Sequence, residues 1–235
     1  AGGASDGSSQ VVISLTDGGG VMGERIEYIC ALADENALVG QTETVMQTDY
    51  YFRGEELMLT DDSGETWVAS GLTTKQLEET KAVYGQGNMI PENSVYADGN
   101  GMFAVFWGET PTLHVSKDDG ETWTDFVFQE EYPRLCTSRI VRFLDPENGY
   151  VGLGTDWSMG TGGATYIGWT HDGGATWETT PVAVENGWIL SGLAFADQSA
   201  GMLTMDEQFG ENSWPHVLVT ENGGASLAEI ELPWD

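Results

Sequence analysis

Short apolar runs alternate with polar turn segments along this chain, and two features recur four times in the same order. The first is an apolar run ending in Asp, then a short loop and a second apolar run, as in a β-hairpin. Its aspartates are Asp34, Asp98, Asp145 and Asp197. The second feature is a turn of the pattern S/T-x-D-x-G-x-T-W, which begins at Thr60, Ser116, Thr170 and, in altered form, Thr220. A repeat of about fifty residues with several short strands per unit is typical of propeller blades.

Each repeat unit is expected to form four strands, with the polar turn joining the third to the fourth. In the third unit, the strands are predicted near residues 138–145, 149–156, 164–171 and 177–183. The units cover about 24–72, 88–128, 138–183 and 188–232. The pattern therefore predicts an all-β protein, a small β-propeller of four four-stranded blades.

Three segments fall outside the repeat. Residues 1–9 are small and polar, and we expect a disordered linker there. An additional strand is expected at 10–16, where it either completes a blade or closes the ring. Because of this strand, five blades are an alternative to four. Residues 73–87 form a helical insertion, because Thr73 and Gln76 fit a capping box. We expect residues 10–235 to be a single domain.

Every position of the repeated turn has a role in folding. The Asp carboxylate can accept backbone hydrogen bonds, the Gly allows a positive φ, and the Trp buries a large ring, as expected between neighbouring units. A calcium loop is the functional alternative, but the ligand spacing of an EF-hand is not found here. We therefore assign a structural role, with no metal and no cofactor, to Asp62, Gly64, Trp67, Asp118, Gly120, Trp123, Asp172, Gly174 and Trp177.

The turns "LTDDSGETW", "VSKDDGETW" and "WTHDGGATW" resemble the Asp-box, or BNR, repeat of sialidase-like propellers. The hairpins "FLDPENGYVG" and "FADQSAGML" are similar to repeats of photosystem II assembly factors. The resemblance implies a propeller with Asp-box turns between strands 3 and 4. It does not select a function, because the family includes sialidases, other glycosidases, receptors and assembly factors.

The net charge narrows the classes of ligand, and the number of cysteines excludes a disulfide scaffold. The net charge of −30, from 38 acidic and 8 basic residues, disfavours nucleic acid and anionic ligands. The sequence has no apolar run long enough to span a membrane. Cys30 and Cys136 are too few for a disulfide scaffold, and we slightly favour free thiols over a disulfide.

Known catalytic patterns are weak. The five arginines do not reproduce the "R-I-P"-like motif that the resemblance implies for a sialidase. His114, His171 and His216 are expected on third strands of different units, without the spacing of a metal site or a triad. Acidic pairs such as Glu130 and Glu131 carry little information among so many carboxylates.

Aromatic residues gather on the face predicted to carry the loops between strands 2 and 3 and the connections between blades. These segments are 46–55, 107–111, 129–136, 156–163, 186–188 and 207–215. Exposed rings beside a few cations suit sugar stacking or a protein hot spot, although any single ring can instead cover the core. The predicted ligand-binding residues are Trp157, Trp107, Trp214, Tyr51, Tyr132, Arg53 and Arg134.

We expect a non-catalytic binding module for a carbohydrate or protein ligand. The linker-like start suggests a secreted or surface-anchored bacterial protein, with a lipid anchor upstream of residue 1 as one means of attachment. A glycoside hydrolase with an unrecognised site is the first alternative, and an assembly factor for other proteins is the second.

Overall fold

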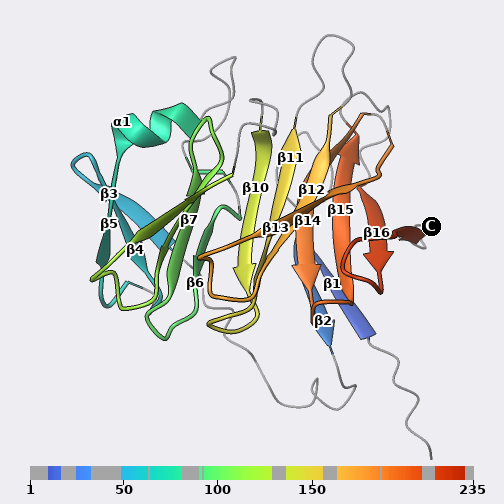
Figure 1. Cartoon of the computed structure of the whole chain (residues 1–235), viewed down its shortest axis with the longest axis horizontal. Helices are drawn as coiled ribbons and strands as arrows, with labels where there is room; N and C mark the ends of the chain where they lie inside the picture. The colour runs from blue at the N-terminus through green and yellow to red at the C-terminus, as the bar shows by residue number, and fades with distance from the viewer. Residues whose placement is uncertain are drawn as a thin grey trace, which may run out of the picture. The chain divides into compact units, whose positions relative to one another are not determined.

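The computed structural model describes residues 10–16, 25–32, 49–62, 64–80, 90–91, 93–128, 136–155, 163–185, 187–207 and 215–230. The described residues are mostly β-strands (Figure 1). The chain divides into two compact units. The middle unit comprises residues 44–190, and the terminal unit comprises residues 1–43 and 191–235.

The middle unit contains three antiparallel sheets in which neighbouring strands follow one another along the chain. The first sheet has β3 (Asp49–Arg53), β4 (Glu56–Thr60) and β5 (Val68–Thr73). The second has β6 (Val95–Ala97), β7 (Phe103–Trp107), β8 (Thr112–Ser116) and β9 (Thr124–Val127). The third has β10 (Cys136–Phe143), β11 (Gly149–Thr155), β12 (Thr165–Thr170) and β13 (Glu178–Val182).

A fourth sheet contains β14 (Trp188–Phe195), β15 (Gly201–Glu207), β16 (His216–Thr220) and β17 (Ala228–Ile230), again in chain order. Apart from the first residues of β14, it belongs to the terminal unit. In the same unit β1 (Gln10–Thr16) pairs with β2 (Arg25–Leu32) as a two-stranded antiparallel sheet.

The predicted fold class is confirmed: the protein is all-β, and it is built from consecutive antiparallel sheets of the propeller-blade type. The first repeat unit differs from expectation, because β2 pairs with β1 and the sheet of β3 to β5 has three strands within the described residues. The expectation of a single domain over 10–235 stays a prediction. The predicted linker 1–9 and the hairpin at Asp34 lie outside the described residues.

The predicted capping box is present. The Thr73 backbone N–H donates to Gln76 Oε1 at 3.1 Å, and the Gln76 N–H donates to Thr73 Oγ1 at 3.4 Å. It begins the short helix α1 (Thr74–Leu77), which continues as the 3-10 helix η2 (Glu78–Thr80). The remainder of the predicted helical insertion lies outside the described residues.

The core of the middle unit lies between its sheets. On β7, alternate side chains point to opposite faces. Phe103 and Val105 join a cluster with Leu57 and Leu59 of β4, whereas Ala104 and Phe106 join another with Val151 and Leu153 of β11. Strand β7 is therefore buried on both faces, and this explains its continuous apolar run "FAVFW".

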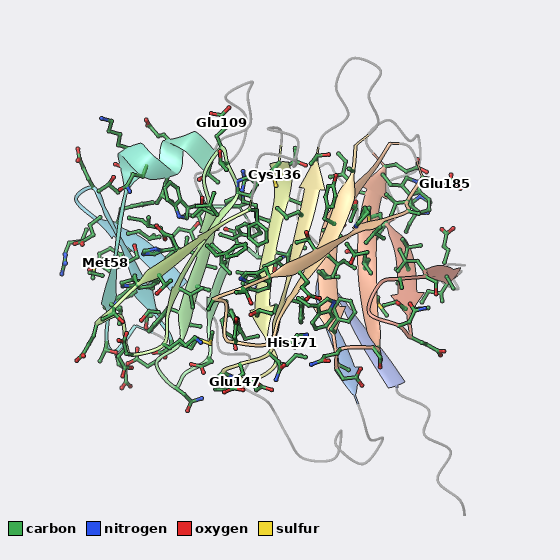
Figure 2. All side chains as sticks on the ribbon, viewed as in Figure 1. Met58, Glu109, Cys136, Glu147, His171 and Glu185 are labelled. Atoms are coloured by element: carbon green, nitrogen blue, oxygen red, sulfur yellow. The ribbon has the colours of Figure 1, made fainter. Side chains whose placement is uncertain are left out.

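Each sheet of the middle unit has two distinct ends. The turn end carries the polar turn before the last strand of the sheet, which we call the acidic turn, and the loop end carries the connection before the last strand but one. Glu147 and His171 lie at the turn end, and Glu109, Cys136 and Glu185 lie at the loop end (Figure 2). Helix α1 is also at the loop end, since the Thr74 N–H donates to the Glu55 carbonyl at 2.7 Å (Figure 1).

Candidate functional site

The acidic turn of the second sheet is closed by its own side chains. The Asp118 carboxylate accepts from the Thr122 backbone N–H at 2.9 Å and from the Thr122 hydroxyl at 2.6 Å. The Ser116 hydroxyl donates to Asp118 and accepts from the Gly120 N–H, both at 2.9 Å. Gly120 has φ +78°. The carboxylate thus stabilises the sharp reversal between β8 and β9.

The same hydrogen bonds recur in the other sheets. Asp62 and Asp172 accept from the backbone N–H and the hydroxyl of Thr66 and Thr176, respectively. In the fourth sheet, Asn222 Oδ1 accepts from the Ser226 N–H at 2.8 Å, but its amide donates to the Ser226 hydroxyl. Asn therefore keeps the geometry of the turn without the charge.

The turns lower the pKa of their carboxyl groups. Hydrogen bonds from the backbone and then the hydroxyl of Thr66 lower the pKa of Asp62 to about 2. Hydrogen bonds from the hydroxyl and then the backbone of Thr176 lower the pKa of Asp172 to about 2. Each set of donors favours the ionised carboxylate.

In the second, third and fourth sheets, the acidic turn is also tied to the hairpin between the first two strands. The backbone N–H groups of Asp119, Gly173 and Gly223 donate to the carbonyls of Gly101, Glu147 and Ser199 at 3.0, 2.7 and 2.8 Å. Within those hairpins, Asp98, Asp145 and Asp197 accept backbone N–H groups that follow them in the chain. In these three sheets, backbone hydrogen bonds therefore join the acidic turn to the hairpin beside it.

The turn tryptophans have both a polar and an apolar role. The indole N–H of Trp67, Trp123 and Trp177 donates to the carbonyl of Gly64, Gly120 and Gly174, each at 3.1 Å. The Trp123 ring packs against the cluster between the first and second sheets, and Trp177 against the cluster between the second and third. The rings of Trp123 and Trp177 thus join their acidic turns to the preceding sheet.

The loop end differs because donor groups there lack acceptors. Trp107 ends β7, and its partly buried ring packs against the cluster between the first and second sheets. Its Nε1 atom is buried and has no hydrogen-bond partner among the residues that the structure describes. The backbone N–H of the next residue, Gly108, donates to the Thr80 hydroxyl at 2.9 Å.

Arg139 approaches the same connection from the third sheet. This side chain of β10 is 2 % exposed, and its guanidinium donates to the carbonyls of Gly108 at 2.7 Å and Cys136 at 2.9 Å. Its Nε atom is buried, and no described residue accepts a hydrogen bond from it. A buried cation satisfied by carbonyls alone is costly, so Arg139 and Trp107 both call for further acceptors.

Tyr51 and Arg53 are placed differently from expectation. The sequence predicted a loop over 46–55, but residues 49–53 form β3, and a tight turn at Gly54 and Glu55 leads into β4. Tyr51 is 39 % exposed and contacts the ring of Trp67 edge-on, with 4.5 Å between ring centroids. Arg53 pairs with Glu56 at 2.9 Å. The register of β3 therefore positions both side chains.

The other predicted binding residues, Trp157, Trp214, Tyr132 and Arg134, lie outside the described residues. Trp107 packs against the cluster between the first and second sheets, and Tyr51 pairs across β3 and β4 with Met58. The grouping of the predicted residues into one binding site stays a prediction. Sequence reasoning missed Arg139 and Thr80 as parts of this end. The charged residue within "SRIVR", an otherwise buried strand, is the signal that could have identified Arg139.

His114 and His216 form hydrogen bonds with residues of the sheets. His114, on β8, bonds Asp125 of β9 and the Ser70 carbonyl of β5, and its ring stacks on Trp123. His216, on β16, lies between Glu229 at 2.7 Å and Glu207 at 3.0 Å. His171 follows β12 directly and so lies in the turn, not on the predicted strand. No group of three or more potential metal ligands occurs within the described residues.

Cys136 is a buried free thiol, and burial raises its pKa. The side chain of Cys30 lies outside the described residues. None of the helices in the described part of the chain has the length and apolar character needed to cross a membrane.

No family model matches this sequence, and no curated protein matches it. Among solved structures, the chain is similar to a GH74 xyloglucanase from Xanthomonas campestris, with a TM-score of 0.49 and 17 % identity over 76 % of this chain and 27 % of that one. For a Niastella koreensis GH74 enzyme, the TM-score is 0.41 and the identity 16 %, over 76 % and 35 % of the two chains. For YCF48 from Cyanidioschyzon merolae, the values are 0.31 and 12 %, over 76 % and 67 %. The chain thus covers 27 % and 35 % of the lengths of the two GH74 enzymes.

Proposed function

We propose that this protein is a non-catalytic binding module whose ligand, a neutral glycan, contacts the loop end of the middle unit. The observation that carries the proposal is the contrast between the two ends of the sheets. At the turn end, the repeated carboxylates and indole N–H groups bond within their own sheet. At the loop end, Trp107 Nε1 and Arg139 Nε are donors without partners in the described part of the chain.

A sugar supplies what this end lacks. Hydroxyl and ring oxygens accept hydrogen bonds, and the apolar face of a sugar ring packs on an indole. A neutral ligand also suits the net charge of −30 better than an anionic one. Because the Trp107 N–H is covered, a ligand oxygen reaches it when neighbouring side chains move aside.

Two Trp→Phe variants on one glycan array test this proposal. Trp107→Phe removes an unpartnered N–H while keeping an aromatic ring, so we expect reduced glycan binding with little loss of thermal stability beyond that of the smaller ring. The matched control, Trp177→Phe, removes an N–H that bonds Gly174 within the acidic turn. We expect that variant to lose stability and to keep its binding.

Glycan binding and thermal stability together test whether the loop end is the binding site. Wild-type protein that binds no neutral glycan on the array overturns the glycan assignment. Binding that is equal in wild-type protein and Trp107→Phe overturns the loop end as the site. Binding that is lost in Trp177→Phe, while that variant stays folded at the assay temperature, assigns recognition to the turn end instead.

A further inference from the structure

A cavity of about 190 Å³ lies at the turn end, between the acidic turns of the second and third sheets. Val115 and Gly174 are buried residues of its lining. Lys117 and Thr124 are exposed, and Asp118 also borders the space. It is separate from the loop end, to which the proposed glycan function is assigned.

Two glycines of the third sheet keep this space open. Gly173 and Gly174 have φ of +68° and +93°. A Cβ atom at Gly173 would lie 1.8 Å from Lys117 Nζ, and one at Gly174 would lie 3.3 Å from Val115 Cγ2. The turn of the third sheet therefore approaches the second closely, with Lys117 directly across from it.

The polar groups around the cavity leave both donors and acceptors for a ligand. Lys117 Nζ donates to the Asp172 carbonyl at 2.8 Å, and an ammonium group has further donors. The Thr122 hydroxyl donates its proton to Asp118 Oδ2, so its oxygen remains an acceptor. One cation and one carboxylate border the same space, and a ligand without net charge fits such a lining.

We propose that this cavity binds the acetamido group of an N-acetylated sugar. The acetyl oxygen accepts from Lys117, the methyl group covers Val115, and the amide N–H faces Asp118. Hydroxyls of the sugar ring donate to Thr122 and Thr124, whose side chains border the open side. A secondary amide matches this lining because it places an acceptor, a donor and a methyl group within one small planar unit.

The test is a titration of the full chain with N-acetylglucosamine, followed by amide chemical shifts in NMR. We expect saturable shifts at Gly173, Gly174 and Ala175, but not at the corresponding Gly223 and Gly224 of the fourth sheet. Glucose, which lacks the acetamido group, should produce none. Lys117→Met, which keeps the aliphatic stem, should abolish the shifts, and Lys75→Met on the exposed face of α1 should preserve them.

Each contrary result identifies a different error. Equal shifts with glucose, or shifts that persist in Lys117→Met, overturn the acetamido assignment. Equal shifts with the methylamide of N-acetylalanine mean that the cavity takes a peptide amide and not a sugar. A wild-type protein with no saturable shift has no such site. Because Trp107→Phe leaves this cavity intact, failure of the loop-end proposal leaves this one standing.

Discussion

Gly120 of the second sheet lies directly against Val68 of the first. A Cβ atom at Gly120 would lie 2.0 Å from Val68 Cγ1, and the residue has φ +78°. The acidic turn is therefore both a reversal of its own chain and part of the contact between neighbouring sheets.

Gly120→Ala should lower the free energy of unfolding by roughly 2–6 kcal/mol, because backbone strain and overpacking each cost about 1–3 kcal/mol. Gly54→Ala is the matched control, since Gly54 has φ +67° but nothing within 4 Å of a built Cβ. It should lose about 1 kcal/mol, the cost of the backbone conformation alone. Equal losses in urea denaturation would show that the contact with Val68 does not matter.

Asp118→Ala should lower the melting temperature, because the Thr122 N–H and hydroxyl lose their acceptor. Asp118→Asn should be milder, since Asn222 forms the same closure in the fourth sheet. The reciprocal change Asn222→Asp should raise the melting temperature, because a carboxylate is the stronger acceptor. An Asn variant at 118 as damaging as Ala would contradict this explanation.

Stability should fall in acid through the acidic turns. The pKa of Asp62 and Asp172 is about 2 in the folded protein, below the ordinary 3.8. A lowered pKa contributes stability that is present above about pH 4 and is lost as the pH falls through about 2. Replacing both residues by Asn should flatten the melting temperature between pH 4 and 2 relative to the wild type. An unchanged slope would show that other carboxylates control acid unfolding.

His216 should act in the opposite direction. Burial alone lowers its pKa, but the hydrogen bonds that the ring donates to Glu229 and Glu207 outweigh burial, and the pKa is raised above 6.5. Its contribution to stability is complete below that value and is lost as the pH rises through the raised pKa. His216→Gln should remove this loss from the melting profile between pH 6 and 9. NMR titration of the ring should show the raised pKa directly, and a value at or below 6.5 would contradict the role of the two glutamates.

The strands and acidic turns could be predicted from the sequence because their determinants are local. Thr170, Asp172 and Thr176 carry the hydrogen bonds of one turn within seven consecutive positions, so a repeated pattern shows both the turn and the strands beside it. The strand register of Tyr51 and Arg53 was missed, because "DYYFR" has polar flanks and resembles a loop.

The loop end was harder to predict because its contacts join distant residues. Arg139 reaches the Gly108 carbonyl across 31 positions, and the Gly108 N–H reaches Thr80 across 28. No pattern within a short stretch of sequence predicts contacts between residues so far apart. The aromatic face inferred from topology therefore included Trp107 correctly at the end of its strand, but it gave no sign of the buried guanidinium beside that connection.

The separation of the two ends has a consequence for how this protein can change. The hydrogen bonds between Asp119 and Gly101, and between Gly173 and Glu147, close each sheet without using any residue of the opposite end. Insertions or exchanges between the second and third strands therefore leave the closure of each sheet intact. The chain is therefore suited to be a scaffold. Each connection between the second and third strands can change, and with it the binding specificity, while each sheet keeps its own fold.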